Sequence, residues 1–174
     1  MSQTLSDFAA LLRSAEESAV HLELRDVYTV ESEAVGFRSW KDGHRLDPSA
    51  PGTWWRPWLD LVREVTAKGV SVRRARVVSE PVSEYVAYEH SFSFTNIAAG
   101  EEIRWLPRRE ASVLPLPGND FWVFDRRTVQ FNVFDGEGRW VHTDETDDPA
   151  VALFCSSAFD AVWERATPHD RFTV

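Results

Sequence analysis

The feature that most constrains the fold is a strand, a helix and a second strand that follow one another between residues 70 and 106. Residues 70–78 are rich in β-branched side chains, and Pro81 ends this run because it lacks a backbone donor for a sheet. A helical pattern over 82–96 is followed by another short apolar run at 103–106. This order favours a right-handed crossover and predicts a sheet with helices packed on its faces.

The last third of the chain predicts further strands and a final helix. Turn sequences separate three strand patterns, which lie at residues 121–124, 128–134 and 139–142. An apolar stripe over 151–163 follows, and Asp148 and Pro149 suit the cap and the first turn of its helix. The fold class is therefore α+β (mixed α/β), with a central mixed sheet that includes a C-terminal three-stranded meander and carries helices on its faces.

The length of 174 residues corresponds to one compact domain. Residues 1–46 are expected to form an N-terminal helix and a strand, the strand lying over 21–30. Residues 47–53 are dense in turn-forming residues and predict a loop. The main α/β body is expected over 54–168, and it opens with an amphipathic helix over 54–65.

Composition and charge exclude several classes of protein. Aromatic residues make up 13% of the chain, with 8 Trp and 11 Phe, which is incompatible with a disordered tail. The lone cysteine, Cys155, excludes a disulfide framework and a four-cysteine zinc site. A net charge of −9 argues against direct nucleic-acid binding and against an anionic membrane surface. The sequence has neither a membrane span nor a signal peptide pattern, so a cytoplasmic location is expected.

A group of arginines is the first candidate for chemistry. Arg74 and Arg76 lie on one predicted strand, and Arg104 and Arg108 lie on or just after the next strand. If these strands are neighbours, their ends bring several guanidinium groups to the edge of an open sheet, where such folds bind ligands. Guanidinium groups suit phosphate or carboxylate. The alternative is that these arginines form ion pairs with the abundant carboxylates of the chain.

Two carboxylates complete the predicted cleft. Glu89 falls on the inward side of its helix, where a carboxylate needs a cation such as Arg74 or Arg76. Glu89 is either half of a partly buried salt bridge or a general base with a raised pKa. Asp125 ends the first strand of the meander. The candidate ligand-binding residues are Arg74, Arg76, Glu89, Arg104, Arg108 and Asp125.

Two adjacent tryptophans are candidates for an interaction surface. Trp54 and Trp55 cannot both face inward on one helix, so at least one is expected to be exposed or covered by the preceding loop. Exposed aromatic side chains would favour a homodimer. The acidic residues 144–148 match no EF-hand, and the chain has no zinc hydrolase, P-loop or nucleophile-elbow motif. No metal, no cofactor and no catalytic residue is therefore assigned.

Several segments in combination resemble a known family. Residues 72–81 with Tyr85 and Glu89, residues 96–104 and residues 120–125 are similar to the DUF6879 family of actinobacterial proteins. The resemblance extends from Phe8 to about Pro168, but it departs from the family pattern at Glu102 and over residues 31–52. It implies a regulatory module encoded beside helix-turn-helix regulators and small acidic proteins. The element order is also similar to half of a phospholipase-D-like fold, although the His-x-Lys pair of that chemistry has no counterpart.

These observations predict a non-enzymatic regulatory or protein-interaction domain that binds an anionic ligand or an acidic partner in an Arg-rich cleft. The expected partner is a helix-turn-helix regulator or a small acidic protein. The alternative is a hydrolase or transferase that acts on a phosphorylated substrate, with Glu89 or Asp125 as base and the arginines as an anion clamp.

Overall fold

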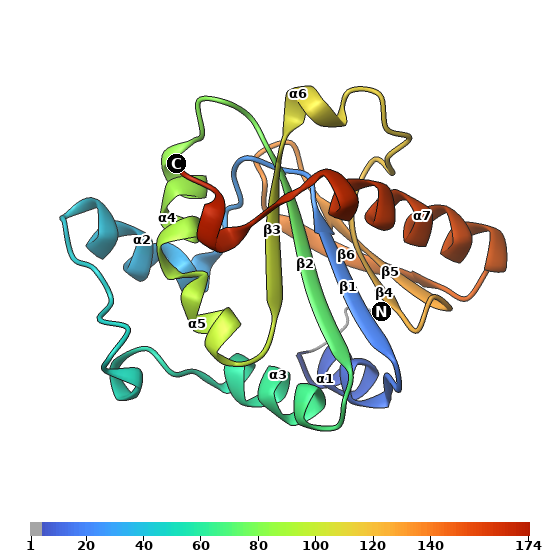
Figure 1. Ribbon diagram of the computed structural model, residues 1–174, viewed down its shortest axis with the longest axis horizontal. Coiled ribbons are helices and arrows are strands. Elements are labelled where there is room, and N and C mark those ends of the chain that lie inside the picture. Colours follow the sequence, from blue (N-terminus) through green and yellow to red (C-terminus); the bar gives the residue numbers. More distant parts are fainter. Residues whose placement is uncertain (1–4) are drawn as a thin grey trace.

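The computed structural model of the chain describes residues 5–174 and is built around one seven-stranded sheet (Figure 1). The strands are β1 (Ser18–Glu23), β2 (Ser71–Val78), β3 (Glu102–Pro107), β4 (Asp120–Phe124), β5 (Thr128–Phe134), β6 (Trp140–Thr146) and β7 (Thr167–Pro168). The α-helices are α1 (Leu5–Ser14), α2 (Ala34–Lys41), α3 (Pro57–Ala67), α4 (Glu84–Phe92), α5 (Phe94–Ala98), α6 (Arg108–Ala111) and α7 (Pro149–Arg165). Short 3-10 helices are η1 (Glu31–Glu33), η2 (Pro51–Thr53) and η3 (His169–Arg171).

The sheet is mixed, as predicted. Its strand order is β6-β5-β4-β1-β2-β3-β7. The strands β1, β2 and β3 run parallel, whereas β4 is antiparallel to β1 and begins the meander β4-β5-β6. The sequence prediction of a mixed α/β fold with a C-terminal three-stranded meander is confirmed.

The two faces of the sheet carry different side chains because neighbouring residues of a strand point to opposite sides. Helix α7 crosses one face, where Phe159 joins a core that includes Leu22, Ala75 and Phe121 (Figure 1). The helices α1, α3, α4 and α5 cover the other face. That second face contains apolar clusters at its two ends and a charged region between them.

Helix boundaries follow the local chemistry. Helix α3 has Pro57 at its first turn, and Gly69 follows its end with a φ of +95°, a conformation that favours glycine. Helix α7 begins behind Asp148, whose carboxylate accepts a hydrogen bond of 2.8 Å from the Ala150 backbone N–H. The start of α7 agrees with the sequence prediction, whereas the helix predicted over 54–65 begins only at Pro57, so Trp54 and Trp55 precede α3. None of the helices in residues 5–174 is long and apolar enough to cross a membrane.

The strand predicted over residues 21–30 is wrong in its bounds. Strand β1 ends at Glu23, where the chain leaves the sheet and its polar groups find side-chain partners. The Leu24 N–H donates to Asp120 Oδ1 at 2.9 Å, and Asp26 accepts the Ser79 N–H at 2.7 Å. The predicted helix over 82–96 is likewise two helices, α4 and α5, which meet at Ser93.

Residues 31–46 contain helical structure that the sequence pattern does not predict. Besides α1 and β1, the range 1–46 holds η1 and α2, and neither of these two has a buried residue. Helix α2 packs on α4 through aromatic rings, with 5.2 Å between the centroids of Phe37 and Tyr88. A helix that buries so little needs no continuous apolar stripe, so its periodicity is weak.

Candidate functional site

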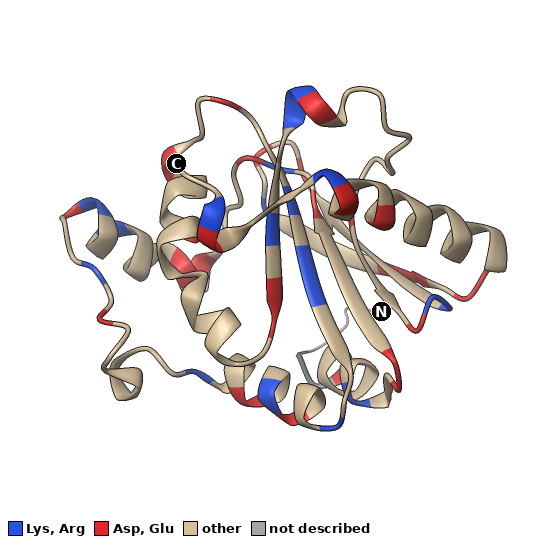
Figure 2. Cartoon of the chain, in the orientation of Figure 1, with Lys and Arg blue, Asp and Glu red and all other residues tan. Residues whose placement is uncertain are grey.

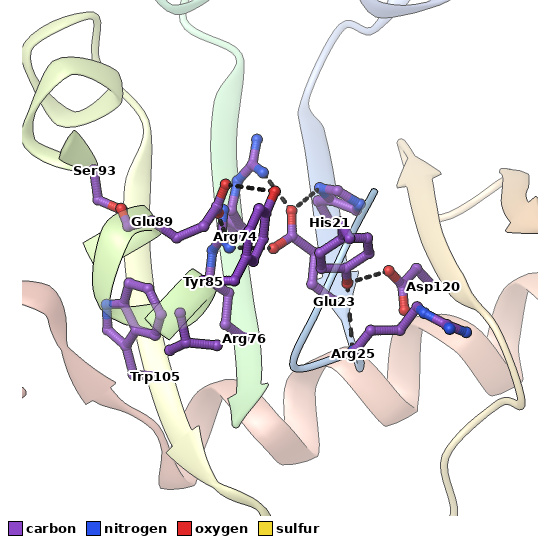
Figure 3. A network of polar contacts seen from close by, with 12 residues as sticks. His21, Glu23, Arg25, Arg74, Arg76, Tyr85, Glu89, Ser93, Trp105 and Asp120 are labelled. Carbon is purple, nitrogen blue, oxygen red and sulfur yellow. Dashed lines mark hydrogen bonds and ion pairs between the residues drawn. The ribbon is translucent and has the colours of Figure 1, made fainter. Parts of the chain in front are cut away.

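A buried ionic network lies on the sheet face opposite α7 (Figure 3). His21 and Glu23 lie two residues apart on β1, and Arg74 and Arg76 lie two residues apart on β2. The parallel register pairs His21 with Arg74 and Glu23 with Arg76, so four polar side chains project from the same face. Figure 2 shows that Lys and Arg residues are concentrated on β2 within the sheet.

Two arginines share three glutamates in this network. Arg74 donates to Glu23 and also to Glu101 Oε1, the second bond being 2.7 Å long. Arg76 Nη1 lies 2.9 Å from Glu23 Oε2 and also pairs with Glu89. The relative exposure of Glu101 is 1% and that of Glu89 is 4%. An unpaired buried charge has a large desolvation penalty, so these side chains can be buried only because they pair with one another.

Burial and charge set the protonation states of the network. Burial alone would raise the pKa of Glu23, but Arg76 and Arg74 outweigh it and lower this pKa to about 2. Burial lowers the pKa of His21 to about 3, and the two arginines add to this effect against the opposing Glu23. Near pH 7 Glu23 is therefore ionised and His21 is neutral. The His21 ring stacks on Trp122, with centroids 4.3 Å apart.

Two tyrosine–carboxylate pairs flank the network. Tyr85 donates to Glu33 Oε2 at 2.5 Å, and burial together with this carboxylate raises the pKa of Tyr85 well above its ordinary value. Tyr28 donates to Asp120. Burial raises the pKa of Asp120 to about 6, although the Tyr28 hydroxyl opposes the shift. Both tyrosines therefore act as hydrogen-bond donors that hold carboxylates in place.

The network forms part of the floor of a cleft, which we name the α2–α4 cleft. One chamber has a volume of about 520 Å³ and is lined by residues that include Trp58, Arg74, Arg76 and Glu89. A second chamber of about 280 Å³ is lined by residues of α2, the following loop and α4. The lining residues common to both chambers are Ser32, Glu33, Arg56 and Phe92. These four residues therefore lie where the two chambers meet.

Arg56 is the guanidinium group at the junction of the chambers. It donates to Thr95 Oγ1 at 3.0 Å and to Asn96 Oδ1 at 2.8 Å, and it lies 5.7 Å from the centre of the Phe92 ring. Within the described part of the chain no carboxylate lies within 4.0 Å of Arg56. Burial lowers its pKa, and the neighbouring Arg74 adds to that effect, whereas the carboxylates of Glu101 and Glu33 oppose it. Sequence reasoning missed Arg56, because a lone arginine before a helix carries no signal.

The structure brings together only part of the predicted site. Arg74, Arg76 and Glu89 meet in the network, and the expected pairing of Glu89 with an arginine is confirmed. Arg104 points to the opposite face, where it donates to the Trp163 carbonyl at 3.0 Å and lies 4.3 Å from the centre of that ring. Arg104 and Trp105 are adjacent on β3, so their side chains point to opposite faces of the sheet.

Arg108 also lies outside the network. It donates to the carbonyls of Leu24 and Val77 at 2.7 Å and 2.9 Å, and it pairs with Asp26 at 3.2 Å. These bonds tie together the carboxyl ends of β1 and β2. The prediction that Arg104, Arg108 and Asp125 join one cleft with the other candidates is therefore wrong.

Asp125 holds the start of β1 instead of lining a cleft. Its carboxylate accepts backbone N–H bonds of 2.8–2.9 Å from Glu16, Glu17 and Ser18. These bonds lower the pKa of Asp125 against the opposing effect of burial. Replacing Asp125 by Ala should lower the free energy of unfolding by about 2 kcal/mol, because three donors lose a charged acceptor. Chemical denaturation measures this loss, and an unchanged midpoint would contradict the role. Asp125→Asn, which keeps one acceptor oxygen, should lose less.

The two candidate interaction tryptophans are engaged within the chain. Trp54 is buried, and its indole N–H donates to the Asp47 carbonyl at 2.9 Å. Trp55 is half-buried, donates to Asp60 at 2.7 Å and is covered by Arg63 at 3.8 Å from its ring centre. The preceding loop therefore covers Trp54, which is one of the two outcomes that the sequence predicts. Across residues 5–174, His, Cys, Asp and Glu side chains form no cluster of three suited to a metal ion.

Comparison with solved structures identifies the architecture. Nuc, a phospholipase D family member from Salmonella typhimurium, superposes with a TM-score of 0.51 at 11% identity, covering 92% of this chain and 86% of that one. NucT from Helicobacter pylori gives a TM-score of 0.53 at 12% identity, covering 94% of this chain and 89% of that one. At such identities the likeness shows the fold alone, and it confirms the expected phospholipase-D-like architecture.

Comparison with protein families shows which family the chain belongs to. No curated protein matches the sequence. The profile of a domain of unknown function, DUF6879, matches residues 6–174. This match covers every strand of the sheet and the whole α2–α4 cleft, and it confirms the resemblance seen in the sequence. The chain therefore belongs to the DUF6879 family.

Proposed function

We propose that this chain is a non-enzymatic regulatory domain that binds a small anionic molecule at Arg56 in the α2–α4 cleft. The observation that carries the proposal is the state of Arg56, a half-buried guanidinium whose side-chain hydrogen bonds within residues 5–174 go to the neutral Thr95 and Asn96. Arg74 and Arg76, in contrast, are neutralised by buried glutamates. The anion site of the cleft is thus assigned to Arg56 and not to the arginines of β2.

The surroundings of Arg56 suit a small ligand. Chambers of about 280 Å³ and 520 Å³ match the lower part of the size range of small-molecule sites. Trp40, Tyr88 and Phe92 supply aromatic walls, and Ser91 supplies a hydroxyl group. A guanidinium that already makes two bonds keeps further N–H groups for a phosphate or carboxylate. Partial burial strengthens such a charge-assisted bond.

The enzymatic alternative has weaker support. Glu89 would have to act as base, yet it is 4% exposed and is paired with Arg76. Asp125, the other proposed base, is held by three backbone N–H groups at the start of β1. The sequence also has no His-x-Lys pair. These features favour binding over hydrolysis or group transfer.

A regulatory role further requires a protein partner. The two expected classes are a helix-turn-helix regulator and a small acidic protein, and charge favours the first. The chain carries a net charge of −9, so a small acidic protein would be repelled and a basic helix-turn-helix regulator would be attracted. We therefore propose the helix-turn-helix regulator as partner, with the cleft ligand as the signal that alters this association.

The Arg56→Gln variant tests the ligand site. Binding of inorganic phosphate, AMP and citrate would be followed by calorimetry and thermal unfolding, after native mass spectrometry of the protein purified from its own host. At least one anion should bind the natural chain, and the substitution should weaken it by about 10-fold to 100-fold, since a hydrogen bond to a charged group is lost.

The matched control is Arg63→Gln. It removes the same charge from an exposed position on α3, outside the lining of the cleft. The control should bind the anion as the natural chain does. Equal weakening by both substitutions, or no binding of any of the three anions together with a ligand-free protein from the host, would refute the site.

A further inference from the structure

The two edges of the sheet differ in how they are protected. Strand β7 closes one edge with only the two residues Thr167–Pro168. Strand β6 forms the other edge with seven residues, and among the described residues 5–174 it pairs only with β5 (Figure 1). Natural edge strands are commonly shielded by proline, by lysine or by being short. The sequence of β6 contains neither proline nor lysine, so its outer side offers a long row of backbone groups.

Five of the seven side chains of β6 are exposed. Trp140 is 43% exposed and Val141 is 52% exposed. His142, Asp144 and Glu145 are also exposed. A long open edge with apolar side chains is a template for strand addition.

The sequence of β6 is complementary to itself in one antiparallel register. The register centred on Thr143 matches the whole strand to its copy, and its regular part runs from His142 to Thr146, because Val141 lies at an irregularity of the β5–β6 pairing. It places His142 opposite Asp144 twice, once on each side of the centre, and Val141 opposite Glu145. No two like charges then face one another, and like charges directly opposite are destabilising. A register centred on Asp144 would instead place that carboxylate opposite its own copy.

We propose that a second copy of this chain adds to β6 by antiparallel pairing centred on Thr143, which joins two sheets into one continuous sheet. The twofold axis runs through Thr143, as expected for an isologous interface. Within one copy His142 Nε2 already lies 3.4 Å from Asp144 Oδ1. In the dimer each imidazole also faces the carboxylate of the other copy, which forms a group of four alternating side chains. This inference does not depend on a ligand at Arg56.

The charge of the chain predicts how this dimer responds to salt. Two copies with a net charge of −9 each repel one another, and salt screens this repulsion. A strand-pair interface is small, so the dimer should form at roughly micromolar to millimolar protein concentrations. Its association should strengthen between about 20 mM and 150 mM salt. A basic partner strand at the same edge would show the opposite salt dependence.

Cysteine cross-linking tests the register. Opposite residues of an antiparallel pair have Cα atoms about 4.5–5.5 Å apart, within the range that a disulfide spans. Thr143→Cys should therefore give a covalent dimer under mild oxidation. In Glu145→Cys, the two cysteines would lie four residues apart along the strands, about 13 Å, and should not link. The natural Cys155 is 0% exposed and does not interfere.

Exchanging the charges at positions 142 and 144 tests the proposed contacts between His142 of one copy and Asp144 of the other. His142→Glu places two pairs of like charges opposite one another and should raise the dissociation constant about tenfold in sedimentation analysis. Adding Asp144→Lys restores opposite charges in the same register and should recover association. The control Val113→Glu adds the same charge at a position that is 82% exposed and lies outside β6, and it should leave association unchanged.

Three results would overturn the proposal. The first is a monomer at every protein and salt concentration. The second is cross-linking of the Glu145→Cys variant as strong as that of Thr143→Cys, which would show a different register. The third is a monomeric chain that binds an extended Lys-rich peptide through β6, which would make a partner strand the occupant of this edge.

Discussion

Replacing Glu23 by Gln is expected to lower the free energy of unfolding by about 3 kcal/mol, because two buried guanidinium groups each lose a charge-assisted hydrogen bond. Glu23 is 7% exposed and is the carboxylate that both Arg74 and Arg76 share. Gln keeps the size of the side chain but carries no charge. Arg74 keeps Glu101 and Arg76 keeps Glu89, so both buried positive charges stay paired, but each guanidinium loses one charged acceptor.

Urea denaturation of matched variants measures this effect. Glu64→Gln is the control, because Glu64 also pairs with two cations, Arg13 and Lys68, but at an exposed surface. The control should change stability little, since surface ion pairs contribute little. The double variant Glu23→Gln, Arg76→Gln should be less destabilised than the sum of its single variants, because it removes both partners. Equal losses for the two glutamate variants would show that the network is solvated.

The second large effect is a dependence of stability on pH that originates in His21. The pKa of His21 is about 3 in the folded chain, against an ordinary value of 6.5. Below pH 6.5 the unfolded chain therefore binds a proton that the folded chain does not bind. Stability from this group is fully present above pH 6.5 and falls by about 1.4 kcal/mol per pH unit as the pH drops toward 3.

The variant His21→Gln isolates this contribution. Its stability relative to the natural chain should rise as the pH falls from 6.5 to about 3, and the gap should be constant above pH 7. The comparison between variants is needed because Asp120 acts in the opposite direction. Its raised pKa of about 6 makes the folded chain bind the extra proton between pH 4 and 6. Parallel stability profiles of the two proteins would contradict a buried neutral His21.

The sequence predicts the elements that have strong periodicity. The β-branched run of β2 and the capped, apolar α7 both lie close to where their patterns predict them. The pairing of Glu89 with an arginine also follows from its inward position on α4. The two elements follow from local periodicity, and the Glu89 pair follows from the need of a buried carboxylate for a cation. One sequence is sufficient to find such features.

Other parts of the site depend on contacts that a single sequence does not contain. Glu23 alternates with apolar residues of β1, and such a pattern normally places a carboxylate in solvent. Here helices cover both sheet faces, so Glu23 is buried. Arg104 and Arg76 look equivalent in the sequence, yet alternation and register place them on opposite faces. Helix α2 has no periodic apolar pattern, because it buries no residue. Arg56 is a single residue before α3 and belongs to no pattern.

The central position of β1 has a consequence for how the chain is made. Strand β1 leaves the ribosome before β2, and its other partner β4 follows about 100 residues after β1. At ordinary rates of synthesis the nascent β1 waits roughly 5–20 seconds for that neighbour. During this interval the edge of β1 that pairs with β4 is open, although Arg74 and Arg76, the partners of Glu23, have already been synthesised. Translation speed and chaperone contact over residues 79–119 should therefore influence the yield of folded protein more than they do after Phe124.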